Sequence, residues 1–503
     1  MSITKIISNF PIFCYHRDDE TPTCVLREDT PMKEPFDLSA LLAQNKTFSL
    51  RRQLGFVCRL SVPGILAQIS SIIMQYIDAA MVGSLGARAS AAIGLVASST
   101  WLLGGLCDAM SMGFAVQVAQ AVGAGEKQRA RAILRQAIIV CALFSLALAA
   151  AGMAVSGALP AWLGGEAAIV PDAAAYFFVF AAALPAFQLF FLLCAVMQCS
   201  GEMRVPGILN VAMCALDVAG NVLFIFGCGL GVLGAALGSA LAVVIVTVAA
   251  VYFACVRSPV LSVRGTGQWL PQRQTLHEAA RISVPMGLEK LALCGAYVMS
   301  TKIIAPLGTV AIAAHSFSIT AESLCYMPGY GIGEAATTLV GQSIGARRAD
   351  LAKRFAWVTV TMGMCVMAAI GLVMYALCPA VFRFLTPDPA VQTLGVRVLR
   401  IELWAEAFYA ASIVVSGALR GAGDTFVPGI MNLVSMWGVR LSLSAFLTPR
   451  LGLSGAWIAM AAELCFRGII FLIRLKRGRW LKRREASAAS LLHPDKEASE
   501  DSL

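Results

Sequence analysis

Charged residues are scarce in this chain of 503 residues, at 14% of the total, where a soluble domain carries about 25%. With 58% hydrophobic residues and a mean hydropathy of +0.76, this scarcity excludes an ordinary soluble domain. The segments between the apolar runs are too short to fold as a catalytic domain, and the sequence has no Walker A pattern for ATP. The first 52 residues are polar and have no apolar core, so we expect no signal peptide.

About twelve apolar runs are present, each long enough to cross a bilayer as a helix, which takes about 20 residues. The sequence therefore predicts an all-α polytopic membrane protein. The expected spans of the first half are 60–82, 91–119, 133–157, 172–197, 205–227 and 232–255, and those of the second half are 282–305, 309–340, 355–379, 396–418, 427–447 and 453–475.

The chain repeats itself at an offset of 222 residues. Gln120 and Gly123 coincide with Gln342 and Gly345, and Pro63 with Pro285. The run Gly201, Val205, Pro206, Gly207 coincides with Gly423, Val427, Pro428, Gly429. Near the end of each half the offset slips by one, so that Gly231 and Gly234 match Gly452 and Gly455. Two similar halves predict a transporter with its substrate path between them, and an even number of spans in each half makes the halves parallel.

The basic residues lie where the positive-inside rule puts cytoplasmic segments, so the net charge of +10 does not indicate nucleic-acid binding. They cluster after the second and eighth spans, in the middle of the chain and in its C-terminal tail. We therefore expect a multi-pass protein of the cell membrane with both termini in the cytoplasm. The expected division is a cytoplasmic tail at 1–52, an N-lobe at 53–255, a connector at 256–281, a C-lobe at 282–475 and a second tail at 476–503.

The fifteen cysteines are mostly scattered through apolar spans, where a cysteine behaves as a small apolar residue. Cys14, His16 and Cys24 lie close together in the N-terminal tail, but their spacing fits no zinc pattern. We expect no metal site, no cofactor and no catalytic residue.

Prolines and glycines interrupt three of the expected spans. Pro63 and Pro285 lie inside the first span of each half and predict bends. Span 309–340 carries Pro328, Gly331 and Gly333, which predict a hinge or break in that helix. Close helix packing by small residues is the alternative for the two glycines.

Placing a charged side chain inside a membrane span costs free energy, so each such residue calls for a functional or structural explanation. Asp78 lies about 27 Å along its span, and Asn221 about 24 Å along the fifth span, at 1.5 Å per residue. Asp217 lies four residues before Asn221, on the same helix face. If the first and fifth spans face a common cavity, these three side chains form a polar cluster that can take up a proton or a cation. Burial and repulsion favour a proton on one of the two carboxylates. The alternative is that each acid is paired with a buried basic residue or tyrosine.

The second half carries further acids within its spans. Glu289, Glu322 and Tyr326 are the candidates for contact with a cationic substrate. For Glu402 and Glu406, which share a helix face, we favour an ion-pair network with Arg397 and Arg400 over substrate contact. Glu463 and Arg467 are spaced for a structural ion pair, and Glu334 is expected to be a solvated residue near a span end.

The acids do not follow the repeat. Asp78 coincides with Ser300 and Asp217 with Val439, while Glu289 coincides with Ala67 and Glu322 with Thr100. The scaffold is thus duplicated and the chemistry is not, so we expect ion and substrate contacts to be divided unequally between the lobes.

Three motifs resemble those of the MATE (multidrug and toxic compound extrusion) transporters. They are the run from Tyr76 to Gly86, the segment with Pro328-Gly329-Tyr330-Gly331 followed by 339–346, and Leu419–Thr425 before Pro428. The likeness covers about residues 55–475. Asp78 matches the acidic residue of the family's first helix, which is implicated in ion coupling, and Glu289 resembles an acidic residue of the seventh. Many members carry Asn-x-x-x-Asp in the fifth helix, and Asp217 and Asn221 stand here in the reverse order.

The resemblance implies twelve helices in two six-helix lobes around a central cavity that opens alternately to either side. It also implies export of organic, often cationic, compounds in exchange for H⁺ or Na⁺, by a membrane transporter and not an enzyme. We expect small molecules, a coupling cation and the bilayer as partners, and a functional monomer. The alternative is a flippase for lipid-linked saccharide precursors, for which Lys290, Lys302 and Arg440 leave room.

Overall fold

The computed structural model describes residues 49–265 and 267–481, and all secondary structure in these ranges is helical. Ser49 caps the first helix, because its hydroxyl accepts a hydrogen bond from the backbone N–H of Arg52 at 3.4 Å. The helices of the first repeat are α3 (Leu50–Gly83), α4 (Ala87–Gly123), α5 (Lys127–Val155), the short α6 (Leu159–Trp162), α7 (Val170–Cys199), α8 (Arg204–Asn221) continued by the π-helix η1 (Val222–Gly227), and α9 (Gly231–Val251) continued by the π-helix η2 (Tyr252–Arg257).

The second repeat follows the same order. Its helices are α10 (Arg273–Ile304) with η3 (Ala305–Leu307), α11 (Thr309–Gly345), α12 (Ala349–Leu385), α13 (Pro389–Glu402), η4 (Leu403–Ala405) and α14 (Glu406–Gly421), α15 (Phe426–Leu433) with the π-helix η5 (Val434–Leu441) and α16 (Ser442–Leu451), and α17 (Leu453–Arg477).

Eleven of the twelve expected spans lie within one of these helical segments, and the span 133–157 runs two residues past the end of α5 at Val155. The twelve-helix prediction is compatible with the structure. Ten segments in the described residues are long and apolar enough by themselves to cross a membrane. The other two are α11, whose 37 residues include many polar and small ones, and the α13–η4–α14 segment, whose two α-helices have 14 and 16 residues.

The duplication is visible in the turns. Gly86 before α4 and Gly308 before α11 have φ angles of 105° and 91°, a conformation that side-chain-bearing residues rarely adopt. They are separated by the repeat offset, so the same glycine turn joins the first two long helices of each half.

The borders of the expected lobes shift slightly. Helix α10 begins at Arg273, so the expected connector 256–281 includes the first turns of that helix. Residues 1–48 and 482–503 lie outside the described residues, and with them Cys14, His16, Cys24 and nearly all of both tails.

The helix break expected around Pro328 is not present, because α11 is helical throughout and contains Pro328, Gly331 and Gly333. The helices α3 and α10 likewise continue through Pro63 and Pro285. A side chain at Gly331 would place its Cβ 2.5 Å from the backbone nitrogen of Ile65 in α3. A Cβ at Gly417 of α14 would lie 2.3 Å from the carbonyl oxygen of Gly333. Both glycines of α11 therefore permit close helix packing, while bending at the three prolines stays a prediction.

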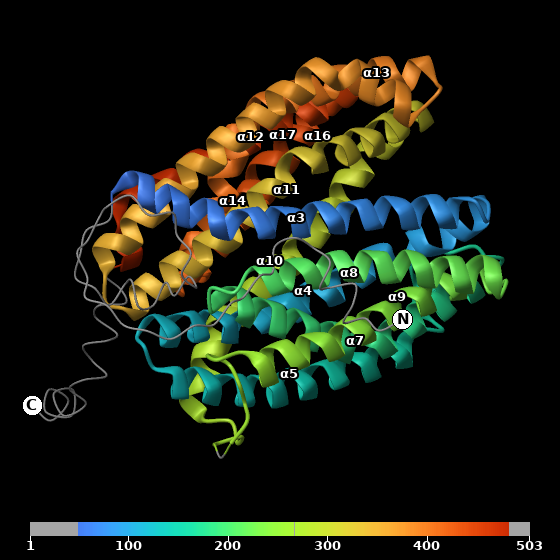
Figure 1. Ribbon diagram of the computed structural model, residues 1–503. Helices are drawn as coiled ribbons and strands as arrows, with labels where there is room; N and C mark the ends of the chain where they lie inside the picture. The colour runs from blue at the N-terminus through green and yellow to red at the C-terminus, as the bar shows by residue number, and fades with distance from the viewer. Residues whose placement is uncertain (1–48, 266, 482–503) are drawn as a thin grey trace, which may run out of the picture. The chain divides into compact units, whose positions relative to one another are not determined.

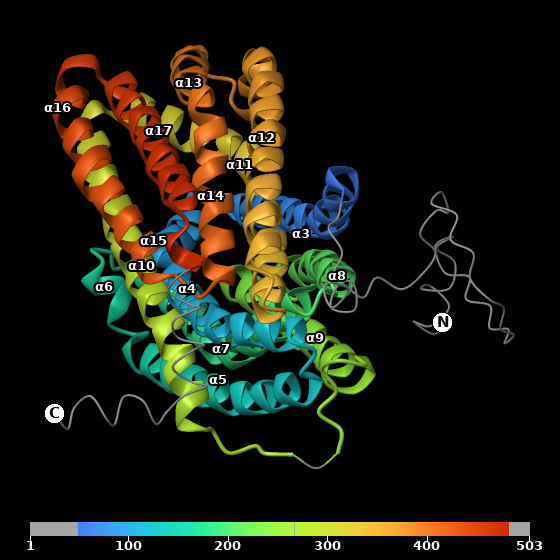
Figure 2. The same ribbon diagram turned by 90° about the vertical axis from the view of Figure 1, so that its left-hand side faces the viewer.

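Helix α11 packs against helices of both repeats, namely α3 and α4 of the first and α12 and α14 of the second. In Figure 1 and Figure 2, the orange and red helices α12–α17 form one group and the teal and green helices α5, α7, α8 and α9 another. Helix α3 contacts both α8 and α11. The side chains of α3 thus lie between the two repeats, which makes polar groups on this helix candidates for function.

Candidate functional site

Helices α3 and α8 bring Asp78, Asp217 and Asn221 together, as the sequence predicts. The side-chain amide of Asn221 donates one hydrogen bond to Asp78 Oδ1 at 2.8 Å and another to Asp217 Oδ2 at 3.2 Å. Asp217 and Asn221 are buried, at 0% and 1% exposure, whereas Asp78 is partly exposed. One amide therefore bridges two carboxyl groups, that of Asp217, which is buried, and that of Asp78, which is partly exposed.

The site is left with unused oxygen atoms. Asp217 Oδ1 and Asn221 Oδ1 are buried and have no hydrogen-bond partner among the described residues, and the carboxyl groups of Asp78 and Asp217 interact directly with each other. Two carboxylates in contact at low dielectric repel each other unless a positive charge lies between them. A shared proton or a small cation held by these oxygens would supply that charge.

The space for Asn221 comes from a glycine of α9. A Cβ at Gly238 would lie 2.3 Å from Asn221 Oδ1 and 2.9 Å from the backbone nitrogen of Asn221. The chain directly after Asn221 winds into the π-helix η1, a distortion that is frequent at functional sites. Tyr176 of α7 also lies within electrostatic range of both carboxyl groups, a neighbour that the sequence pattern does not reveal.

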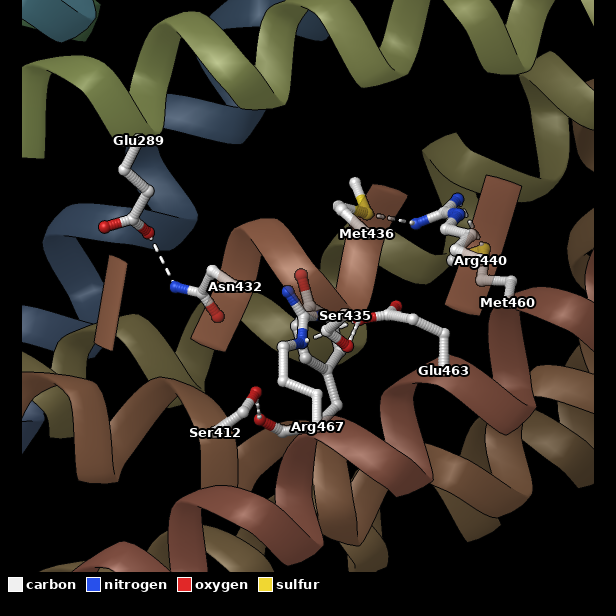
Figure 3. A network of polar contacts seen from close by, with 10 residues as sticks. Glu289, Ser412, Asn432, Ser435, Met436, Arg440, Met460, Glu463 and Arg467 are labelled. Carbon is white, nitrogen blue, oxygen red and sulfur yellow. Dashed lines mark hydrogen bonds and ion pairs between the residues drawn. The ribbon is translucent and has the colours of Figure 1, made fainter. Parts of the chain in front are cut away.

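The second repeat contains its own acid–amide pair, seen at the left of Figure 3. Glu289 of α10 accepts a hydrogen bond at 2.6 Å from the side-chain amide of Asn432 in α15. Glu289 is partly exposed and Asn432 is buried. The structure thus places Glu289 in a pair resembling the one at Asp78, with a single acid instead of two.

A second polar network of this repeat lies at the centre of Figure 3. Glu463 accepts a hydrogen bond from Ser435 at 2.5 Å and forms an ion pair with Arg467 at 3.2 Å, which confirms the predicted i,i+4 pair. Arg440, in η5, has the thioether sulfurs of Met436 and Met460 as its hydrogen-bond acceptors. It is 8% exposed and lies within electrostatic range of Glu322 and Glu402.

The ion-pair network favoured for Glu402 and Glu406 is wrong. Both side chains are fully buried, and within the part of the chain that the structure describes all four of their carboxyl oxygens lack a hydrogen-bond partner. Arg400 instead donates to the carbonyl oxygen of Tyr375 at 3.3 Å and lies over the ring of Tyr375. The rotation of the helix thus directs a nearby arginine to another partner.

Glu322 and Tyr326 lie one turn apart on α11 but differ in access. Glu322 is 2% exposed, whereas Tyr326 is partly exposed. The ring of Tyr326 lies 6.0 Å from that of Tyr330 and 5.4 Å from that of Tyr409. These three tyrosines form an aromatic cluster of the kind that attracts organic cations.

Glu334 is not the solvated end residue that the sequence predicts. Its carboxylate accepts hydrogen bonds from Gln68 of α3 at 2.8 Å and from Gln198 of α7 at 3.1 Å. A second connection between the repeats is the ion pair of Lys290 in α10 with Asp108 in α4, at 3.6 Å. Sequence spacing gives no signal for either contact, because each depends on how helices of different repeats approach one another.

Comparison with known proteins places this arrangement in a family. The family model described as MatE matches the chain twice, at residues 63–223 and 285–446. The two matched segments begin one repeat offset apart, which agrees with the duplication. Among relatives, a probable multidrug resistance protein NorM of Pseudomonas aeruginosa is 29% identical over 88% of this chain and 93% of its own length. The multidrug resistance protein PmpM of the same organism is 26% identical over 90% of this chain and 99% of its own.

Solved structures show the same fold. An outward-facing multidrug resistance MATE transporter of the MOP superfamily superposes with a TM-score of 0.83 at 18% identity, covering 90% of this chain and all of that one. A point mutant of the Vibrio cholerae MATE transporter VcmN gives 0.79 at 17% identity, with 85% and 97% covered. Since the family model matches most of the chain in both halves, the protein belongs to the MatE family of multidrug efflux transporters.

Proposed function

We propose that this protein is a secondary active exporter of organic, often cationic, compounds, driven by exchange for H⁺ or Na⁺. The observation that carries the proposal is the bridged pair of carboxyl groups, Asp78 and Asp217, with Asn221 between them. Relatives named as multidrug resistance proteins support export of small molecules as the class of activity.

The coupling step follows from the access of the two acids. Asp78 is partly exposed and can receive an ion, whereas Asp217 and Asn221 are buried and can hold it away from water. Binding there removes the repulsion between the carboxyl groups and lets α3 and α8 pack more closely. Because α3 also contacts α11, this change reaches the other repeat and alters the substrate path between the repeats.

The orientation of the chain in the membrane follows from the basic residues. Arg129 and Arg131 near the start of α5, Arg348 before α12, and Lys476 at the end of α17 lie at helix ends that the positive-inside rule assigns to the cytoplasm. The protein is then a multi-pass cell-membrane protein with both termini inside and its coupling site in the outer half of the bilayer.

Substrates meet the second repeat on the aromatic cluster of Tyr326, Tyr330 and Tyr409, and Glu289 supplies a negative charge that is reachable from the path. Aromatic faces bind flat cations of different shapes, which suits a broad substrate range. The ion and the substrate thereby act on different repeats of a single chain, with no need for a second copy.

A lipid-linked saccharide flippase is not favoured. Such a protein needs several cationic groups free to bind pyrophosphate, but Lys290 is engaged with Asp108, and Arg440 is buried against two thioethers. Of the three basic residues, this leaves Lys302, exposed in the last turn of α10.

Efflux of a fluorescent organic cation from proteoliposomes tests the proposal, with a pH gradient and a Na⁺ gradient applied separately. Asp78→Asn should reduce gradient-driven efflux at least about tenfold, since an amide cannot carry the ion. The matched control is Asp172→Asn, which removes a partly exposed acid of the same repeat that lies 3.8 Å from Arg88. Efflux lost equally in both variants, or in neither, contradicts the coupling role of Asp78.

A further inference from the structure

Two glutamines tie the repeats together at one end of the helices. The side-chain amide of Gln342 in α11 donates to the carbonyl oxygen of Cys199 at 2.9 Å. The side-chain amide of Gln120 in α4 donates to the carbonyl oxygen of Gly421 at 3.2 Å. Each bond runs from the second long helix of one repeat to the last residue of α7 or α14 in the other repeat.

These bonds are copies of each other under the repeat. Both the two glutamines and the two acceptor residues are separated by 222 positions. The acceptors are suited to the task, because the last carbonyls of a helix have no partner within it. A duplicated chain has thus kept a reciprocal contact, in which each half holds the other in the same way.

The backbones approach closely at the same place. A Cβ at Gly123, the last residue of α4, would lie 2.0 Å from the carbonyl oxygen of Gln342. A Cβ at Gly345, the last residue of α11, would lie 1.9 Å from the carbonyl oxygen of Gln120. Only glycine allows this approach, so the contact of α4 with α11 is built into both repeats.

A third set of contacts between the repeats is made by α11 and has no equivalent at α4. Glu334, Thr338 and Gln342 lie on one face of α11, and Thr338 donates to the carbonyl oxygen of Gln198 at 3.1 Å. Glu334 accepts from the Gln198 side chain and from Gln68 of α3. The equivalent positions of α4 before Gln120 are Met112 and Val116, which form no such bonds because they are apolar. Only the α11 half is therefore reinforced by a charged group.

We infer that Gln120 and Gln342 form a paired glutamine clasp, together with the Gly421 and Cys199 carbonyls, that closes the substrate path at its cytoplasmic end, and that Glu334 holds the α11 half shut. This inference rests on the proposed export function and on the orientation proposed with it. Opening the path at this end separates α11 from α7 and α4 from α14, which breaks both clasp bonds. The buried Gln342 amide then loses its acceptor, so the clasp sets how often this end opens.

The test measures the distance between spin labels carried on non-canonical amino acids at Lys127 and Lys353, which are exposed near the starts of α5 and α12. This labelling leaves the fifteen native cysteines in place. The variants are Gln120→Met, Gln342→Met and the double substitution, which preserve side-chain volume and remove the donor. The control is Gln188→Met, which removes a buried glutamine that donates only within the first repeat, to Ser111 and Cys107.

We expect the double variant to raise the share of the long-distance state about threefold to tenfold over wild type, and each single variant to raise it less than the double variant does. Glu334→Gln should raise the share of the long-distance state less than the double variant does. Gln188→Met should leave it unchanged, and the melting temperature of the single variants should stay at that of the control. If the double variant does not fold, the distance distributions of the two single variants test the clasp.

A wild-type distance distribution in both single variants overturns the clasp. So does an equal change in Gln188→Met, which would mark a general loss of packing. The distances are measured without substrate or gradient, so their outcome is separate from that of efflux. If the wild-type protein exports substrate but the glutamine variants keep the wild-type distance distribution, the clasp alone is refuted. If the variants change the distance distribution but the wild-type protein shows no efflux, the export function alone is refuted.

Discussion

The acids within the helices of the two repeats have different partners. In the first, Asp78 and Asp217 share the amide of Asn221 and have direct contact with each other. In the second, Glu289 alone accepts from the amide of Asn432, Glu463 is neutralised by Arg467, and Glu402 and Glu406 have no hydrogen-bond partner in residues 49–265 and 267–481. Duplication preserved the helices, the glycine turns and the clasp, while the acids were placed separately in each half. The bridged carboxyl pair of the first repeat therefore has no counterpart in the second, although both stand on one duplicated scaffold.

The largest effect on stability is expected at the neutralised acid of the second repeat. Glu463→Gln leaves Arg467 without its ion partner in the interior of the bundle, which costs about 3 to 5 kcal/mol for a buried pair. The melting temperature in detergent measures this loss. Glu126→Gln, which breaks the exposed pair with Arg129, is the control and should cost less than about 1 kcal/mol. Equal effects of the two substitutions would contradict the structural role of Glu463.

A smaller loss is expected from Gly238→Ala in the first repeat. The new methyl group would overlap Asn221 Oδ1 and approach its backbone, so the amide bridge must move. Overpacking of this kind costs about 1 to 3 kcal/mol, and gradient-driven efflux should fall with it. The corresponding residue of the second repeat, once the offset has slipped by one, is already Ala459. Ala459→Gly should therefore leave efflux unchanged, and an equal loss in both variants would remove Asn221 as the reason.

The smallest effect is expected from Glu402→Gln and Glu406→Gln. Neither acid has a hydrogen bond or ion pair to lose among the described residues, so the free energy of unfolding should change by less than about 1 kcal/mol. The melting temperature in detergent measures this change. Gradient-driven efflux should persist in both variants. A loss of efflux as large as that of Asp78→Asn would move ion coupling into the second repeat and reverse the comparison.

Much of the scaffold could be predicted from the sequence, because apolar length and a repeat offset are carried by the chain itself. The proximity of Asp78 to Asn221 could also be predicted, since similar depths along two helices bring side chains to one level. The surroundings of Glu334, Glu402 and Glu406 could not. Whether an acid meets a donor depends on helix rotation and on contacts between distant helices, which spacing along one helix does not determine.

Pro328 illustrates a second limit. A proline followed by alternating glycines predicts a break when it is considered alone, but α11 is supported from several sides. The backbone of α3 packs directly against Gly331, and that of α14 against Gly333. Small residues that weaken an isolated helix are here the residues that allow its neighbours to approach.

The most direct test of the central claim is the movement of ions that substrate transport causes in proteoliposomes. An organic cation is supplied on one side, without an imposed ion gradient, and the counter-movement of H⁺ and of radioactive Na⁺ is recorded for wild type and Asp78→Asn. The account predicts that one of the two ions moves opposite to the substrate in wild type and that neither moves in Asp78→Asn. Ion movement at the wild-type rate in Asp78→Asn would contradict the coupling site at Asp78, Asp217 and Asn221.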